Sequence, residues 1–177
     1  VGAYTEKVTI TEPDAQGFVP VAPSGGLSPF TRTSNGWASA WPLKPDVVFE
    51  GGNAGKDVLG AIGINSLNLL TVHNLPQERL FTTTNATSAA SALGARMAAQ
   101  LMAAYPALRP ETIRALIVHS AEWTAAMRTV YLPAHGHPSK SDHVNLIRHC
   151  GWGVHDVDRA LWSAGNSLTL VIEDMVH

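Results

Sequence analysis

The sequence lacks several features that would assign it directly to a well-defined class of protein. It has one cysteine, Cys150, in 177 residues, so no intrachain disulfide framework can form. Charged residues make up 15% of the chain and the formal net charge is −2, which argues against electrostatic binding to nucleic acid. The longest apolar run is interrupted by Arg96 and Gln100, so no stretch of about 18 apolar residues is present that could span a membrane.

The chain is long enough for one domain with a hydrophobic core. The opening Val1-Gly2-Ala3-Tyr4 does not resemble a targeting segment, and we expect it to be the interior of a longer polypeptide. We expect one unit over residues 1–165, with residues 166–177 starting a following strand, at Leu168–Asp174, or a downstream domain. Cys150 is expected to act as a small buried apolar residue and not as a reactive thiol.

Short apolar runs followed by helical patterns indicate an α/β protein with a largely parallel sheet. Strands are predicted within Val1–Ile10, at Asp46–Phe49 and at Asn68–Val72. Between the first two lies a Pro/Gly/Ser-rich loop, Thr11–Pro45, which is long enough to suggest a functional role.

Three helices are predicted after these strands. The clearest, Ser88–Ala104, is apolar around its whole circumference and is therefore expected to be buried. A second begins at Pro110 and ends near Trp123, and a third covers Asp156–Ala164. The polar stretch Pro133–His143 shows no apolar period.

The most informative segment is Thr84-Asn85-Ala86-Thr87-Ser88-Ala89-Ala90-Ser91-Ala92, which leads into the first predicted helix. Unpaired N–H groups and a partial positive charge at a helix start favour an anion beside it. Ser88 could therefore be a nucleophile, given a base to take its proton and donors for the oxyanion. Asn85, Thr87 and Ser88 are also good helix caps, so this segment alone leaves catalysis and capping both open.

The segment around Ser88 resembles the nucleophile motif of the subtilisin-like serine proteases, or subtilases, whose usual form is Asn-Gly-Thr-Ser-x-Ala-x-Pro. Further blocks resemble this family and occur in its order along nearly the whole chain. They include a strand, a "Ser-x-Phe-Ser-x-x-Gly" word, a "Lys-Pro-Asp-Val" word, the helix after the nucleophile helix, and a Gly-aromatic-Gly turn with the last helix. In this sequence they are Val1–Ala3, Ser28–Ser34, Lys44–Val48, Leu108–Ile117, Gly151–Val154 and Asp156–Leu161.

The resemblance implies a serine endopeptidase, with residues 1–165 as the C-terminal portion of its catalytic domain. The implied fold is part of a three-layer α/β domain with a mainly parallel sheet and a central buried nucleophile helix. Ser88 would attack a peptide carbonyl, a His would act as base and then acid, and an Asp would orient that His. Asn85, Ala86 and Thr87 would lie beside the oxyanion and the substrate.

In the family the catalytic Asp and His precede the Ser in the chain, so both, with the oxyanion Asn, are expected upstream of Val1. The isolated chain is accordingly expected to be inactive. The implied partners are a protein or peptide substrate and the N-terminal half of the same catalytic domain, and the isolated chain is expected to self-associate. No cofactor is evident, and structural calcium is implied only by the resemblance. Members of the family are often secreted, but the sequence does not fix a compartment.

Three positions depart from the family pattern. Ala86 replaces the usual Gly, Ala92 replaces the usual Pro, and Glu50 stands where an "Ala-Pro-Gly" word has its Pro. These departures leave an alternative open, a non-catalytic subtilase-derived domain used for binding or structure. A third possibility is an unrelated α/β binding module whose helix is capped at Ser88.

The histidines were considered as a local base and as metal ligands. His73 precedes Ser88 and His119 lies on the second predicted helix, but neither has the neighbouring words that the family places around its base. His135, His137 and His143, with His149 and Asp142 nearby, lack the ligand spacing of a zinc site. We therefore predict a partly buried structural role for His73 and His119, and a solvated loop at His135–His143.

Overall fold

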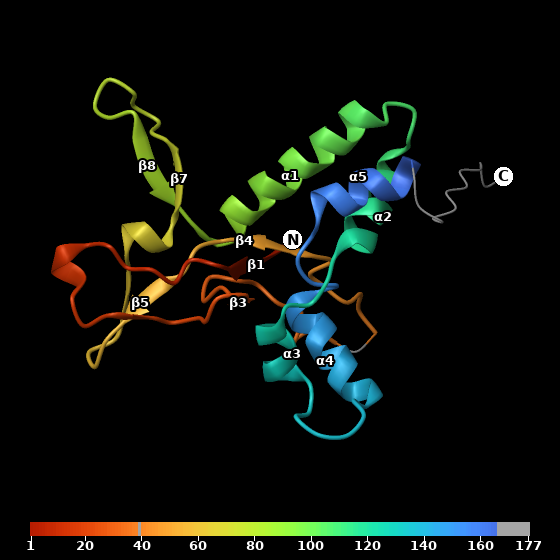
Figure 1. Cartoon of the computed structure of the whole chain (residues 1–177), viewed down its shortest axis with the longest axis horizontal. Coiled ribbons are helices and arrows are strands. Elements are labelled where there is room, and N and C mark those ends of the chain that lie inside the picture. Colours follow the sequence, from red (N-terminus) through yellow and green to blue (C-terminus); the bar gives the residue numbers. More distant parts are fainter. Residues whose placement is uncertain (39, 166–177) are drawn as a thin grey trace.

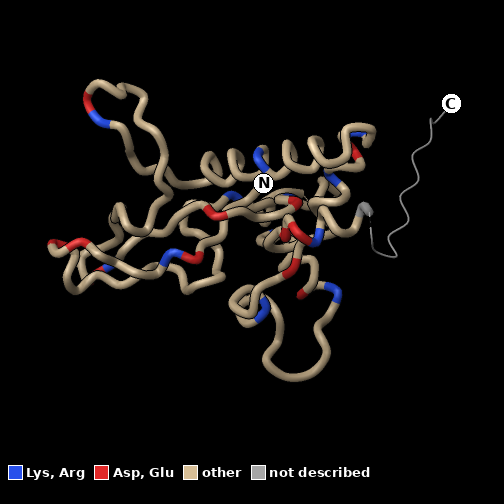
Figure 2. The backbone as a smooth tube through the Cα atoms, turned by 45° about the horizontal axis from the view of Figure 1, so that its top comes forward, with Lys and Arg blue, Asp and Glu red and all other residues tan. Residues whose placement is uncertain are grey.

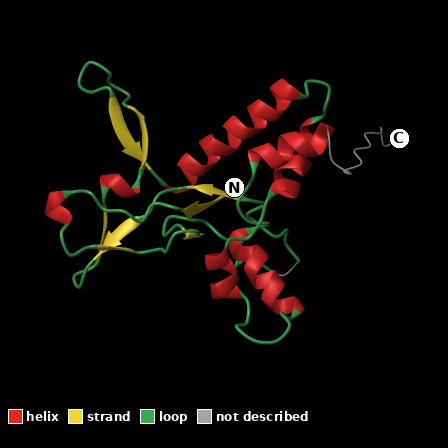
Figure 3. Ribbon diagram, viewed as in Figure 1, coloured by secondary structure: helices red, strands yellow, loops and turns green. Residues whose placement is uncertain are grey.

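The computed structural model describes residues 1–38 and 40–165, which form a mixed α/β structure (Figures 1 and 3). The predicted strand at Leu168–Asp174 and the proposed separate unit at 166–177 lie outside the described residues. The strands are β1 (Gly2–Thr5), β2 (Val19–Pro20), β3 (Gly26–Leu27), β4 (Val48–Glu50), β5 (Ala54–Lys56), β6 (Ala61–Gly63), β7 (Leu69–Val72) and β8 (Phe81–Thr84). The helices are α1 (Ala86–Ala104), α2 (Pro110–Ser120), α3 (Ala125–Tyr131), α4 (Lys140–Cys150) and α5 (Val157–Gly165), with 3₁₀ turns η1 (Pro13–Ala15) and η2 (Asn65–Leu67).

Strands β1 and β4 lie at the centre of the molecule and pair in parallel, with Gly2 opposite Val48 and Ala3 opposite Phe49. Alternate residues of a strand point to opposite faces, so Val47 and Phe49 enter one hydrophobic core and Val48 enters another. Helices α1, α2 and α5 cover the first face, and α3 and α4 cover the second (Figure 1).

The larger core forms between β4 and the first group of helices. Its fully buried members come from β1, the β4 segment, α1, α2 and α5. They are Ala3, Val47, Phe49, Ala90, Met97, Leu101, Ile113, Leu116 and Ala160. Most of them belong to the runs from which strands and helices were predicted, because periodic apolar residues determine which face of an element is buried.

The smaller core contains Val48, Met127, Leu146 and Cys150. Cys150 is completely buried, and burial raises the pKa of its thiol to about 12, which confirms the expected structural role. Helix α4 was not predicted. It begins at a capping box in which Ser139 and Asp142 exchange hydrogen bonds, inside the stretch interpreted as a polar loop.

Two segments form one unit, here called the accessory lobe (residues 6–22 and 53–67). The strands predicted within Val1–Ile10 end at Thr5, and the rest of the lobe was predicted to have no regular secondary structure. Strand β2 pairs with β5 in antiparallel fashion, and the Glu12 carboxylate accepts hydrogen bonds from the N–H and hydroxyl of Ser66. A small core of Ala15, Ile64 and Leu67 lies beneath them. The lobe lies at the left of Figure 1. Part of the long loop Thr11–Pro45 is therefore packed structure.

The sheet differs from the expected one. Among the strand pairs of the described residues, only β1–β4 is parallel, whereas β1–β3, β2–β5, β5–β6 and β7–β8 are antiparallel. Helix α1 also differs, since it is buried on one side only, through Ala89, Ala90, Met97 and Leu101. Its outer side has no cover from the described residues, although only Arg96 in this helix is charged (Figure 2).

The described helices were also compared with the length and apolar character that a membrane span requires. None of them meets both requirements.

Candidate active site

The predicted nucleophile segment forms a sharp turn, here called the elbow (residues 85–88), between strand β8 and helix α1. Asn85 has an extended backbone, and Ala86 follows with a φ of 64°, in the left-handed region that favours glycine. The N–H of Ala86 donates to the carbonyl of Gly51 at 2.7 Å, which fixes the elbow to the end of β4. A glycine would adopt this conformation without strain, so Ala86 adds backbone strain at this point.

Asn85 occupies the N-cap position of α1, but its side chain makes no capping hydrogen bond. Its Nδ2 instead donates to Oδ1 of Asn68 at 3.2 Å. Asn68 is nearly buried, and its own Nδ2 donates to the carbonyl of Ile64 at 3.0 Å. The elbow is therefore held by two successive side-chain hydrogen bonds, which lead from Ile64 of the accessory lobe through Asn68 to Asn85.

Ser88 lies in the first turn of α1 and is exposed to solvent. Within residues 1–38 and 40–165, its hydroxyl makes no hydrogen bond, and the backbone N–H groups of Thr87 and Ser88 have no acceptor. In an ordinary capped helix the N-cap side chain would accept one of these N–H groups, and the Asn85 side chain does not. The elbow thus presents a free hydroxyl and free donors on the same turn, which is the arrangement that an oxyanion requires.

The histidines do not complete this site within the described chain. His73 is half-buried on the loop between β7 and β8, where its Nδ1 lies 3.1 Å from the carbonyl oxygen of Leu75. His119 is exposed on α2. The partly buried position predicted for His73 is therefore confirmed, whereas the one predicted for His119 is wrong, because His119 is exposed. No hydrogen bond connects either residue to Ser88 in the part of the chain that the structure describes.

Another histidine, His155, was not singled out from the sequence. Its ring stacks on Phe49 with centroids 3.7 Å apart, next to the larger core. Burial lowers the pKa of His155, so the imidazole is stabilised in its neutral form. No sequence pattern marked it, because its stacking partner lies 106 residues away on β4.

The loop before α4 and its histidines were examined as a metal site. Among the described residues, no group of three or more His, Cys, Asp or Glu side chains is placed to hold a metal ion. His143 approaches the carbonyl of Ser139, and His149 stacks on Tyr131 at 4.6 Å between ring centroids. These two rings therefore have structural partners within the α3–α4 unit.

Two further residues build the elbow and were not predicted as site residues. Glu50 replaces the family proline, and its carboxylate accepts the N–H groups of Glu6 at 2.6 Å and Gly52 at 2.8 Å. This contact folds the chain after β4 beneath the elbow. Asn68 was read only as the start of a strand, although a buried asparagine bordering an apolar run could have indicated a hydrogen-bonding role.

Comparison with known protein families gives a match over most of the chain. The sequence model of the subtilase family matches residues 1–153. The chain belongs to the subtilase family. As a subtilase, it carries the elbow, α1, α2, α3 and α4 within the matched region, and α5 follows it.

One curated relative of this subtilase is described as "Uncharacterized protein y4bN", from Sinorhizobium fredii (strain NBRC 101917 / NGR234). It is 30% identical over 162 residues, which cover 88% of this chain and 35% of the relative. The chain thus spans about a third of the length of that relative. No solved structure matches the chain.

Proposed function

We propose that this subtilase chain supplies the nucleophile of a serine endopeptidase, and that Ser88 is that nucleophile. The observation that carries the proposal is the elbow itself. Its serine is exposed, its N–H groups have no acceptor among the described residues, and its N-cap side chain is directed elsewhere. A purely structural helix start would use these groups for capping.

In the proposed reaction the Ser88 oxygen bonds to the scissile carbonyl carbon while a histidine takes the hydroxyl proton. The carbonyl oxygen becomes an oxyanion that accepts hydrogen bonds from the Ser88 N–H and from an asparagine side chain. The histidine then returns the proton to the leaving amine, and water hydrolyses the acyl-enzyme by the reverse sequence of proton transfers. Because no described histidine reaches Ser88, the His, the Asp and the oxyanion Asn are proposed to come from a segment preceding Val1.

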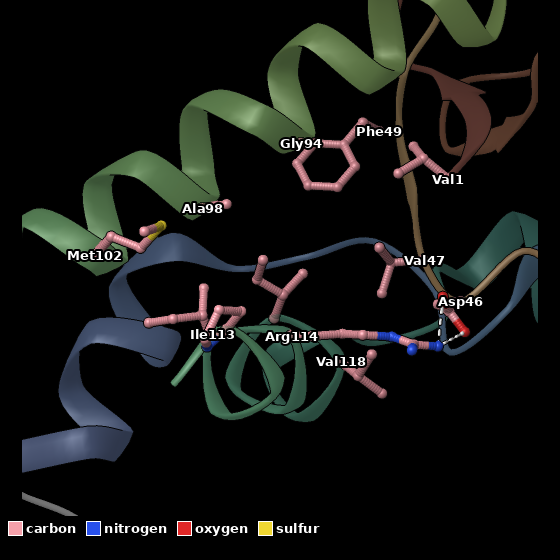
Figure 4. Close-up of a pocket in the computed structure, with 12 residues that line it drawn as sticks. Val1, Asp46, Val47, Phe49, Gly94, Ala98, Met102, Ile113, Arg114 and Val118 are labelled. Atoms are coloured by element: carbon pink, nitrogen blue, oxygen red, sulfur yellow. Dashed lines mark hydrogen bonds and ion pairs between the residues drawn. The ribbon is translucent and has the colours of Figure 1, made fainter. Parts of the chain in front are cut away.

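We further propose that this preceding segment completes a three-layer domain with a mainly parallel sheet and a central α1. The outer side of α1, which includes Ala92, Ala95 and Ala99, is exposed, and Met102 is 51% exposed. An apolar pocket of about 310 Å³ also opens beside α1, with the Asp46–Arg114 ion pair at one end (Figure 4). Its apolar walls include Val1, Val47, Phe49, Ala98, Met102 and Ile113. Uncovered apolar surface of this extent favours association, either with the preceding segment or with another copy.

A fluorophosphonate probe tests the proposal in the full-length protein, because it bonds to activated serines only. Mass spectrometry of the digested adduct is expected to locate the probe on Ser88. Ser88→Ala is expected to abolish labelling and proteolysis, and to change the free energy of unfolding by less than about 0.5 kcal/mol because the residue is exposed. Ser91→Ala, three residues further along α1 and also exposed, is the matched control and should retain both activities. An adduct on another residue of an active protein would contradict the assignment.

The second candidate function is a non-catalytic binding or structural domain of subtilase ancestry. The strained Ala86 favours it, because the family has a glycine there and the added methyl lies beside the expected substrate path. A folded full-length protein that neither labels nor cleaves would support this candidate over the peptidase.

A further inference from the structure

The side chain of Asn85 has two possible hydrogen-bonding partners, and the structure shows it with only one of them. From the N-cap position it could accept the N–H of Thr87 or Ser88, which are the groups that such a residue normally caps. Instead it donates to Asn68, 17 residues earlier. The choice matters because the N–H of Ser88 is the donor that the proposed reaction needs.

We propose that Asn68 is a positioning residue that holds the Asn85 side chain away from the helix start and so keeps the Ser88 N–H free. This inference rests on the proposed peptidase function for its catalytic consequence. Its structural part, the competition between Asn68 and the helix N–H groups for one amide side chain, stands independently.

The surroundings of Asn68 suit this role. Its side chain is nearly buried, and its Nδ2 is committed to the Ile64 carbonyl, which leaves Oδ1 oriented toward Asn85. Its backbone N–H donates to Asn65 at 3.0 Å, so η2 fixes the main chain as well. A buried acceptor with a fixed position captures a neighbouring amide better than a mobile one, because less conformational entropy is lost on forming the bond.

The Ala86 backbone reinforces the same arrangement. Its N–H is already satisfied by Gly51, so among the first three N–H groups of α1 only those of Thr87 and Ser88 remain free. Both of these would become candidates for capping if Asn85 were released. Loss of Asn68 is therefore expected to let Asn85 cap the N–H of Thr87 or Ser88, while Ser88 keeps its position in the first turn of α1.

The kinetic test uses the full-length protein and the variants Asn68→Ala, Asn85→Ala and the double variant. Asn68→Ala is expected to lower kcat by about tenfold or more and to change KM by less than about twofold, because an oxyanion donor acts in the transition state. The double variant has no side chain that could cap, so it is expected to recover at least about threefold of the lost kcat. A residue that only supports the fold would give the opposite result, a double variant no better than Asn68→Ala.

Asn65→Ala is the matched control. Asn65 belongs to the same 3₁₀ turn and accepts a hydrogen bond from the Thr83 hydroxyl at 3.0 Å, but among the described residues no hydrogen bond joins its side chain to Asn85. Its replacement is expected to leave kcat within about twofold of the unmodified protein. An equal loss in Asn65→Ala and Asn68→Ala would overturn the proposal.

Residue-resolved hydrogen exchange gives a readout that needs no activity. The N–H groups of Thr87 and Ser88 are expected to exchange rapidly in the unmodified protein, about tenfold more slowly in Asn68→Ala, and rapidly again in the double variant. Unchanged exchange in Asn68→Ala would overturn the inference even if the protein is a peptidase. If the exchange pattern is as expected but Ser88 takes no fluorophosphonate, the proposed function fails and the positioning of Asn85 stands.

Discussion

The region around β1 and β4 and the accessory lobe are built by different kinds of contact. Around β1 and β4, the segments that resemble family motifs contact one another. Asp46 forms an ion pair with Arg114 of α2, and the carbonyl of Asp46 accepts the N–H of Trp152 at 2.7 Å. In the lobe, the two segments pair with each other through β2 and β5, and the β5–β6 turn leaves Val58 99% and Leu59 92% exposed. The motif-like segments are therefore held by contacts with one another, whereas the accessory lobe is held by contacts of its own.

The lobe meets the β4 segment where the N–H of Glu6 donates to the Glu50 carboxylate, and Asn53 ties the two segments of the lobe together. It is completely buried at the end of the β4 segment, and its side chain exchanges hydrogen bonds with Ala22 and also bonds to Lys7 and Ala54. On its other side the lobe reaches the elbow through Asn68, which bonds to Ile64 of the lobe and to Asn85. Changes in each region should therefore have separable effects, as four substitutions would show.

The largest effect is expected for Gly153→Ala in the family region. Gly153 has a φ of 106°, and a Cβ atom there would overlap the carbonyl of Glu122, which pairs with Val154. We expect a loss of about 4 kcal/mol in the free energy of unfolding, measured by urea denaturation of the full-length protein. Gly136→Ala is the control, because Gly136 has a φ of 87° and no atom near its Cβ position. It should cost only about 1 kcal/mol, and an equal loss in both would refute the packing argument.

The second effect concerns the connection between the two segments of the accessory lobe. Asn53→Leu keeps the volume but leaves the buried groups of Lys7, Ala22 and Ala54 without partners, so we expect a loss of about 3 kcal/mol. Hydrogen exchange should rise in residues 6–22 and 53–67 before it rises in α1. Asn74→Ala, at an exposed position, should change neither quantity. Uniform loosening of the whole molecule would mean that the lobe is not a separate unit.

The third effect depends on pH. Burial disfavours the ionised form of Asp46, but hydrogen bonds from Lys44 and Arg114 outweigh it and hold the pKa of Asp46 below its ordinary value. A lowered pKa stabilises the fold above the ordinary value of about 3.9, and this stabilisation is lost as the pH falls through the folded-state pKa. Asp46→Asn should therefore lower the free energy of unfolding by about 1 kcal/mol at pH 7, and by close to nothing at a pH below the folded-state pKa of Asp46. A difference that is constant with pH would show that the charge of Asp46 is not responsible.

The smallest effect is expected at the elbow. Ala86→Gly relieves a left-handed alanine, worth about 1–2 kcal/mol, but adds about 0.5–1 kcal/mol of chain entropy in the unfolded state. The net result should be a gain of about 0.5 kcal/mol. Ala92→Gly, the same change inside α1, should instead lose about 1 kcal/mol. A loss in both variants would mean that Ala86 is not strained.

Local sequence patterns predicted most of the helices and strands around β1 and β4. The apolar period placed α1, α2 and α5 close to their observed bounds, and Pro110 marked the start of α2. The run Asp46–Phe49 overlaps β4, since a short apolar run between turn residues reads directly as a buried strand. Helices α3 and α4 were missed, because a polar segment with a good cap folds as a helix once Met127 and Leu146 find a core to enter.

At the candidate site, the sequence by itself determined the word around Ser88 and its place at a helix start, because residue type and spacing along one turn suffice for that. Only the tertiary structure decided what the side chains of that turn do. Whether Asn85 caps α1 depends on Asn68, and whether Ala86 is strained depends on the Gly51 carbonyl, 35 residues earlier in the chain. Likewise, the pairing of β2 with β5 joined two segments that show no pattern alone. Hydrogen bonds between distant residues depend on how the chain brings them together, and no local period in a sequence records that.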